Sequence, residues 1–114
     1  MSAASVAGAT DGLAILVTTV GDAGAARSLA RAVLEARLAA CVQIAPVVSL
    51  YEWNGAIQET DEFVLQMKHR VEDYAALAAL VRRRHGYQTP EIVRIDVADV
   101  DPTYLKWARE TTAR

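Results

Sequence analysis

The sequence has very little that could cross-link the chain. It contains 114 residues and one cysteine, Cys41, so a single chain cannot form an internal disulfide. A lone thiol is typical of a protein in a reducing compartment, which predicts a cytoplasmic location. The length fits one domain, and a domain of this size buries enough apolar surface to be stable without disulfides.

The sequence also lacks long apolar runs and an excess of positive charge. No apolar stretch approaches the roughly 18 residues of a membrane-spanning helix, so we expect no membrane insertion. The net charge is −2, which leaves no broad basic surface for nucleic acid. Residues 1–12 are small and polar, without the basic and apolar segments of a secretory signal. We expect them to form a disordered tail ahead of a single domain at 13–114.

The motifs of the common enzyme and metal sites are missing as well. The chain has no GxGxxG or GxxxxGK[ST] phosphate loop, no CxxC pair and no HExxH motif. A serine or cysteine hydrolase needs an imidazole beside its nucleophile, and only His69 and His85 are available. These absences predict that the protein is not an enzyme.

Apolar residues, in contrast, are abundant. They make up 53% of the chain, and the mean hydropathy of +0.13 is high for a soluble monomer. Alanine contributes much of this count and adds little apolar area. The remaining apolar surface nevertheless predicts an interface between copies of the chain.

Hydrophobic periodicity predicts an alternation of strands and helices. In chain order we expect a strand at 13–20, a helix from Asp22 to about Arg37, a strand at 39–53, a return strand at 56–70, a helix at about 72–84, a strand at 91–100 and a helix that begins at Pro102. Asp22 and Asp101 are suitable N-caps for two of these helices. The order βαββαβ followed by a C-terminal helix predicts an α+β protein with the ferredoxin-like fold.

The third and fourth elements form an unusual hairpin. Asn54-Gly55 is the strongest short signal for a tight β-turn. The return strand is polar in its middle, so that part cannot face the core, and we expect the hairpin to extend beyond its own sheet. Tyr51 and Trp53 flank the turn. An exposed aromatic pair at such a tip predicts contacts in an oligomer interface.

The stretch RRRHGYQTPEIVRIDV, residues 82–97, brings several polar side chains into one turn. His85 as a helix end and Tyr87 as a packed ring each have a purely structural explanation. Together with Glu91 they indicate the edge of a pocket. Lys68 ends the return strand, and we expect it at the same end of the sheet. We therefore predict a ligand-binding cleft lined by Lys68, His85, Tyr87 and Glu91.

The same residues suggest a metal site. Cys41 offers the single thiol, and thiolates favour Cu(I), whereas Cu(II) would start from His85 and Glu91. A small buried hydrophobe is the more common role for a free cysteine. His69 has a structural alternative as well, that of a surface residue at a strand end. The predicted metal ligands are Cys41, His85 and Glu91, for copper or another divalent cation.

Two long stretches resemble the CutA family of divalent-cation tolerance proteins, and the resemblance covers about residues 14–108. They are RLAACVQIAPVVSLYEWNGAIQETDEFVLQMKHR and RHGYQTPEIVRIDV. The positions that match the family pattern are Ala40-Cys41-Val42, Pro46, Ser49, Tyr51, Trp53, Glu59, Asp61, Glu62, Lys68, His85, Tyr87, Pro90, Glu91, Ile92 and Tyr104-Leu105-x-Trp107. The combination is far more specific than any one of its parts.

The resemblance implies a ferredoxin-like subunit in a tight homotrimer whose architecture is similar to that of the PII signalling proteins. It implies that the long hairpin packs on a neighbouring subunit, that clefts between subunits collect the lysine, histidine, tyrosine and glutamate positions, and that copper and other divalent ions are the relevant ligands. Gly86 and Gln88 depart from the family's proline and glutamate. The second departure removes a carboxylate, so we expect weak metal binding at this turn.

Two other functions compete with divalent-cation binding. One is a PII-like regulatory module that takes a small anionic ligand between subunits through Lys68 and His85. The other is an enzyme, since acylphosphatases share the fold. It is the least favoured, because TTVGDAGAAR is a poor phosphate-binding loop.

Overall fold

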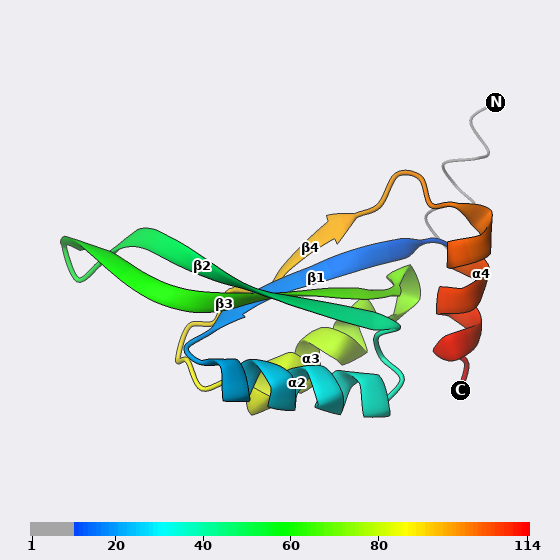
Figure 1. Cartoon of the computed structure of the whole chain (residues 1–114), viewed down its shortest axis with the longest axis horizontal. Helices are drawn as coiled ribbons and strands as arrows, with labels where there is room; N and C mark the ends of the chain where they lie inside the picture. Colours follow the sequence, from blue (N-terminus) through cyan, green and yellow to red (C-terminus); the bar gives the residue numbers. More distant parts are fainter. Residues whose placement is uncertain (1–10) are drawn as a thin grey trace.

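The structure is a computed structural model that describes residues 11–114. Its elements, in chain order, are β1 (Leu13–Val20), α2 (Ala23–Glu35), β2 (Cys41–Trp53), β3 (Ala56–Arg70), a single 3₁₀ turn η1 (Val71–Asp73), α3 (Tyr74–Arg84), β4 (Val93–Asp96) and α4 (Pro102–Thr111) (Figure 1). The predicted order of strands and helices is confirmed. The last strand is shorter than predicted, and the second helix begins only after the 3₁₀ turn.

The four strands form one antiparallel sheet in the order β2-β3-β1-β4. This order places β1 in the centre, where it pairs with both β3 and β4, and leaves β2 and β4 as the edges. The α+β class and the ferredoxin-like arrangement predicted from the sequence are confirmed.

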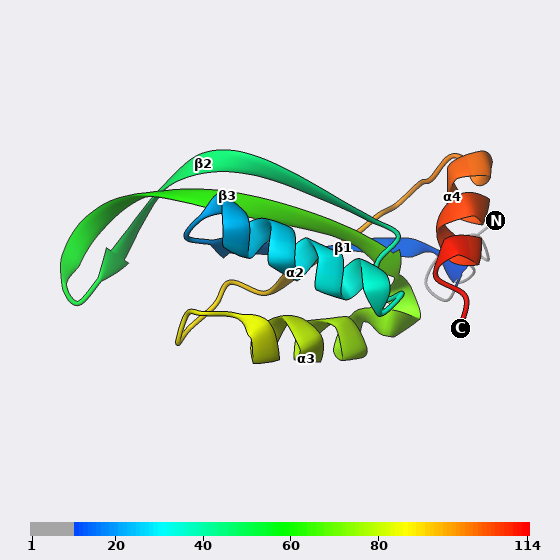
Figure 2. The same ribbon diagram turned by 60° about the horizontal axis from the view of Figure 1, so that its bottom comes forward.

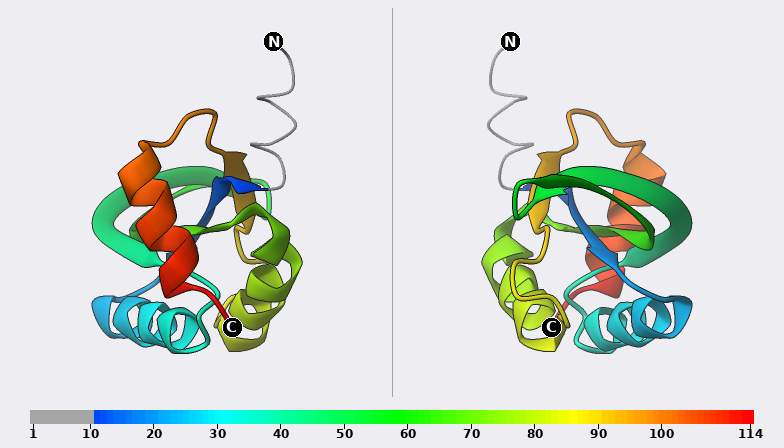
Figure 3. Two further views of the ribbon diagram at one scale, coloured as in Figure 1. Left: turned by 90° about the vertical axis from the view of Figure 1, so that its right-hand side faces the viewer. Right: turned by 90° about the vertical axis from the view of Figure 1, so that its left-hand side faces the viewer.

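Helices α2 and α3 lie side by side and cover one face of the sheet (Figures 2 and 3). Asp22 begins α2 as predicted, because its Oδ1 accepts a hydrogen bond of 2.8 Å from the N–H of Ala25. Alternate residues of the strands point into this layer, and Leu16, Leu65 and Met67 are fully buried there. Burying each such side chain stabilises the fold by about 2 kcal/mol before entropy is counted.

The opposite face of the sheet is apolar and is covered only in part: α4 packs at the start of β1, where Leu13 and Ala108 belong to one buried cluster. We call this surface the open face, and it comprises Ile15, Val17, Ala45, Val64, Val93 and Ile95. Val93 is 47% exposed and Ile95 is 52% exposed. Because a contiguous apolar surface of this kind is rare on a monomer, the predicted oligomer keeps its physical basis.

The hairpin of β2 and β3 extends well beyond the sheet, as predicted. Pairing of β1 with β3 stops at Val20 and Phe63, whereas β2 and β3 continue to pair up to Trp53 and Ala56. Figure 1 shows this part projecting past the helices. Asn54 and Gly55 have φ values of 53° and 79°, the left-handed geometry of a type I′ turn.

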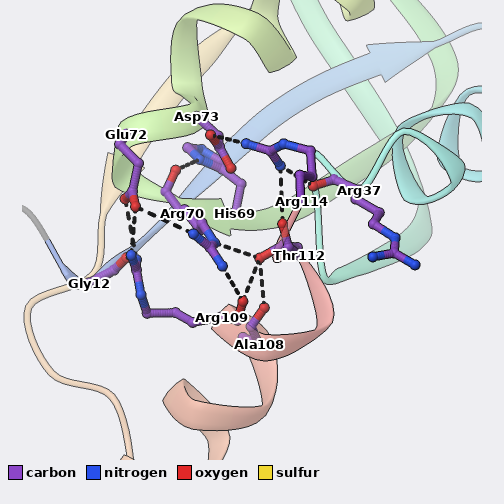
Figure 4. Close-up of polar contacts among 10 residues, drawn as sticks. All are labelled: Gly12, Arg37, His69, Arg70, Glu72, Asp73, Ala108, Arg109, Thr112 and Arg114. Carbon is purple, nitrogen blue, oxygen red and sulfur yellow. Dashed lines mark hydrogen bonds and ion pairs between the residues drawn. The ribbon is translucent and has the colours of Figure 1, made fainter.

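A polar cluster attaches α4 to the start of α3 (Figure 4), and we call it the C-terminal clasp. Glu72 accepts hydrogen bonds from Arg109 at 2.5 Å and 3.2 Å, and this pairing lowers the pKa of the Glu72 carboxyl. Asp73 accepts a hydrogen bond of 2.6 Å from Arg114, and Arg70 donates to Thr112 at 2.9 Å. The clasp fixes the last residues of the chain against the base of the sheet.

The predicted tail falls mostly on residues 1–10, which lie outside the described residues. Gly12, at its end, is buried, and its carbonyl accepts hydrogen bonds from the Val71 N–H at 3.3 Å and from Arg109 at 3.2 Å. Along residues 11–114, no helix combines the length and the apolar character needed to cross a membrane.

Candidate functional site: a cleft beneath the hairpin

A cavity of about 760 Å³ lies between the hairpin and the segment 86–91. The hairpin contributes Ser49, Leu50, Tyr51, Trp53, Thr60 and Glu62, the end of β1 contributes Thr19, and the remaining lining residues are Gly86, Tyr87, Gln88, Thr89 and Glu91. The cavity is partly open to solvent. Its size suits a small molecule more than a bare ion.

His85 holds the 86–91 segment against the end of β1. Its Nδ1 accepts a hydrogen bond of 3.1 Å from the N–H of Tyr87, so Nε2 carries the ring proton of the neutral side chain. Nε2 then donates to the carbonyl oxygen of Thr19 at 2.8 Å and lies 3.1 Å from the Thr18 hydroxyl. Both ring nitrogens are therefore engaged, and a metal ion or an anion at His85 would have to displace one of these bonds.

Tyr87 and Glu62 form the polar floor of the cleft. The Tyr87 hydroxyl donates a hydrogen bond of 2.8 Å to Oε2 of Glu62, and Glu62 is only 8% exposed. Burial, followed by the Glu62 hydrogen bond, raises the pKa of Tyr87 to about 12. The phenol therefore remains protonated over the whole physiological range and serves as a fixed donor.

Glu62 was not identified as a site residue from the sequence, where it counted as part of the polar middle of the return strand. The sequence feature that could have identified it is its position in the alternation of side chains along the strand. Glu62 shares a strand face with Val64 and Gln66, so it points to the side opposite the helices. The 86–91 segment returns on that side, where Tyr87 contacts Glu62, and this return is a tertiary contact that no local pattern specifies.

We predict that the Tyr87 hydroxyl loses its proton at a higher pH than an ordinary tyrosine does. A pH titration followed by the ultraviolet absorbance of phenolate should show a step with a pKa of about 12 in the wild type. This step should be missing in Tyr87→Phe, which lacks the hydroxyl. Between the ordinary value of 10.0 and this value the folded state retains a proton that the unfolded chain loses, so stability should fall as the pH rises above 10.0. The variant Glu62→Gln should move the step down towards 10.0. An unchanged titration in Glu62→Gln would contradict the assigned contact.

The structure does not bring Lys68 to this cleft within one subunit. Lys68 pairs with Ile15 near the start of β1, whereas His85 contacts Thr18 and Thr19 near its end. At about 3.4 Å per residue, the contacted positions are about 10 to 14 Å apart along the strand. Lys68 contacts Tyr104 of α4, and Figure 1 shows α4 and the 86–91 segment at opposite ends of the molecule. The expectation that both share one end of the sheet is therefore wrong for a single subunit.

Lys68 instead lines a second, smaller cavity of about 270 Å³. Its Nζ lies 5.5 Å from the centre of the Tyr104 ring, which is a cation–π contact. Asp99 and Asp101 line the same cavity. The charge of Lys68 is therefore directed towards an aromatic ring and acidic neighbours of its own subunit.

Cys41 is the neighbour of Lys68 in the β2–β3 pairing and is half-buried on the side of the open face. It is therefore far from the 86–91 segment as well. Among residues 11–114, no three side chains of His, Cys, Asp or Glu are grouped so that they could hold a metal ion. One subunit therefore does not bring Cys41, His85 and Glu91 together as a copper site.

His69 is completely buried, and the structural alternative of a surface residue is wrong. Its Nδ1 donates a hydrogen bond of 2.7 Å to the carbonyl oxygen of Arg70, and its Nε2 has no partner among the described residues. Burial lowers the pKa of the imidazole, and the Arg70 hydrogen bond only partly opposes this effect.

The two departures from the family pattern occupy the cleft. A side chain at Gly86 would meet no atom within 4 Å, so the backbone here does not require glycine. Gln88 lines the cavity and leaves Glu62 and Glu91 as its charged residues. Tyr51 and Trp53, the predicted interface pair, are 42% and 50% exposed and form part of its wall.

Comparisons with known proteins agree on one family. The sequence model of the CutA1 divalent ion tolerance protein family matches residues 14–111. The Divalent-cation tolerance protein CutA of Thermus thermophilus is 38% identical over 99 residues, which cover 86% of this chain and 96% of that relative. Protein CutA of Mus musculus is 40% identical over 88 residues, which cover 76% of this chain and only 50% of the mouse protein.

The solved structures give the same result for the fold. The structure of the periplasmic divalent cation tolerance protein CutA from Archaeoglobus fulgidus matches with a TM-score of 0.87 at 33% identity. The match covers 89% of this chain and 99% of that one.

Proposed function

Because the chain belongs to the family of CutA1 divalent ion tolerance proteins, we propose that it contributes to divalent-cation tolerance as a homotrimer that binds copper or another divalent cation. The observation that indicates a positively charged ligand is the negative charge of the cleft. Its charged residues are Glu62 and Glu91, both carboxylates. A carboxylate-lined cleft favours a cation over the small anion considered for a PII-like module.

The open face and the hairpin support the trimer. Val93 and Ile95 on the open face, and Leu50, Trp53 and Ile57 on the hairpin, are large apolar side chains that are between 47% and 79% exposed. Packing copies of the chain together would remove this surface from water. The projecting part of each hairpin would then contact a neighbouring subunit.

Assembly also bears on the metal. Since Cys41 lies apart from Glu91 in one subunit, a metal ion bound by both would need ligands from two subunits. Cys41 offers a soft ligand for Cu(I), and the carboxylates offer hard ligands for ions such as Mn²⁺. The proposed metal ligands are therefore Cys41 for copper and Glu91 for harder cations, and His85 serves mainly to fix the turn.

Metal titrations of the wild type, Cys41→Ser, His85→Ala and Glu91→Gln would test this assignment. We expect Cys41→Ser to lose Cu(I) binding and Glu91→Gln to weaken binding of hard divalent cations about tenfold, because a charged ligand is replaced by a neutral amide. The measurement is calorimetry on the species whose mass is three times 12.3 kDa. If Cys41→Ser and Glu91→Gln both bind metals as the wild type does, the proposed metal ligands are incorrect.

A second candidate function is a regulatory module that binds a small molecule, as in the PII-like alternative. The observation that favours it is the size of the cleft, about 760 Å³, which is within the range of small-molecule sites. The absence of a catalytic role and the cytoplasmic location remain predictions, and the Archaeoglobus fulgidus relative is named periplasmic.

A further inference from the structure

We propose that the cleft beneath the hairpin binds a small organic cation, consisting of an ammonium or guanidinium group on an apolar body. This inference rests on the second candidate function, ligand binding in the cleft, and specifies the chemical class of the ligand. It does not depend on whether the protein binds metal.

The negative charge of Glu62 is the first reason to expect a cationic ligand. Glu62 as a whole residue is 8% exposed, and within residues 11–114 its carboxylate forms no ion pair with Lys, Arg or His. No basic side chain lines the described part of the cleft. A buried carboxylate without a countercharge is costly, so a cation that reaches it gains both the attraction and relief from that cost.

The hydrogen-bonding capacity of the cleft points to the same class. Tyr87 occupies one oxygen of Glu62, and the second oxygen has no donor among the described residues. The Thr60 hydroxyl oxygen, also in the cleft, is buried without a partner. An ammonium group carries three donors and no acceptor, and a guanidinium group carries several donors in one plane. Either could donate to the Glu62 oxygen that Tyr87 leaves free.

The wall on the hairpin side supplies the apolar component. Leu50, Tyr51 and Trp53 line the cavity there. Aromatic faces attract organic cations through the ring quadrupole, and apolar walls bury the body of the ligand. A hydrated metal ion would use neither of these features, so they indicate an organic cation in addition to any metal ion that the carboxylates bind.

Three matched probes separate charge from shape. They are 2-phenylethylamine, which is a cation at neutral pH, the neutral 2-phenylethanol and the anionic phenylacetate. Binding is measured by calorimetry on the intact, assembled protein after treatment with a chelator, so that metal plays no part. We expect the amine to bind at least about tenfold more tightly than the alcohol, as charged hydrogen bonds to a carboxylate provide, and phenylacetate to bind worst.

The variant Glu62→Gln keeps the size of the side chain and an acceptor for Tyr87 but removes the charge. It should abolish the preference for the amine over the alcohol. Glu59→Gln, on an exposed position of the same strand outside the cleft lining, is the matched control and should retain the preference. Tighter binding of phenylacetate, a preference that survives in Glu62→Gln, or no binding of any probe would each overturn the proposal. Failure of the metal titrations alone would leave it standing.

Discussion

Replacing Trp53 with alanine is expected to weaken assembly far more than it disturbs the subunit. Trp53 is 50% exposed in the single chain and lies at the tip of a hairpin that its own sheet does not support. An aromatic side chain buried at the centre of an interface typically contributes about 2 kcal/mol or more, which is about thirtyfold in the dissociation constant for each contact. The three equivalent contacts of a trimer would multiply this effect.

The measurement is light scattering after size exclusion over a dilution series, combined with circular dichroism. The wild type should have a mass of three times 12.3 kDa, and Trp53→Ala should dissociate at much higher concentration with an unchanged spectrum. Leu34→Ala is a suitable control, because Leu34 is a similarly exposed apolar residue, at 39%, on helix α2. A variant that keeps both its mass and its melting temperature would show that Trp53 is not part of an interface.

Acid should destabilise the protein through His69, the second large effect that we expect. The imidazole is fully buried, and burial lowers its pKa in the folded state below the ordinary value of 6.5. Between these two pKa values the unfolded chain binds a proton that the folded chain does not bind. Stability is therefore fully present above pH 6.5 and declines below it, by up to about 1.4 kcal/mol per pH unit, until the pH passes the folded value.

The groups around His69 do not remove this effect. Tyr74 lies with its ring centre 5.9 Å away, and the field of Arg94 lowers the pKa of the imidazole further. The carboxylates of Asp73 and Asp96 act in the opposite direction, but less strongly than burial does. Protonation would place a second N–H, on Nε2, where the described residues offer no acceptor.

Denaturant unfolding at a series of pH values would measure this dependence. His69→Asn retains an N–H near the position of Nδ1 for the Arg70 carbonyl and cannot titrate, so its stability should be lower at neutral pH but flatter towards acid. Tyr74→Phe is a control that keeps the ring and the titration of His69. Parallel curves for the wild type and His69→Asn would mean that another group causes the acid response.

The sequence was sufficient for the architecture because each element carried its own local signal. Asp22 and Asp101 capped the helices that they were expected to cap, and Asn54-Gly55 formed the predicted turn. The alternation of Leu65 and Met67 with polar residues correctly gave the face of β3 that packs on the helices. Patterns of this kind depend only on residues that are close in the chain, so they can be identified without any knowledge of the tertiary structure.

The candidate site was only partly predictable, because it depends on contacts between distant segments. Tyr87 and Glu91 line a cleft within one subunit, and their role in ligand binding stays a prediction. Lys68 was placed at the wrong end of the sheet, since a strand end alone does not say which end of the next strand it faces. His69 was considered as a surface residue because it follows a lysine near the end of a strand. In the fold its ring centre lies 5.9 Å from that of Tyr74, the first residue of α3, and no pattern in the local sequence predicts this burial.

The exposed edge of the hairpin has a consequence for the fate of a dissociated subunit. β2 is an edge strand of 13 residues, and its unpaired N–H and C=O groups form a template on which further strands can add without limit. Pro46 removes one donor from this edge and interrupts the template only once. A closed ring of subunits would occupy the edge, whereas a variant that cannot close the ring would leave it free. Fibrous or amorphous aggregates, more than clean monomers, are thus the expected end state of interface variants kept at high concentration.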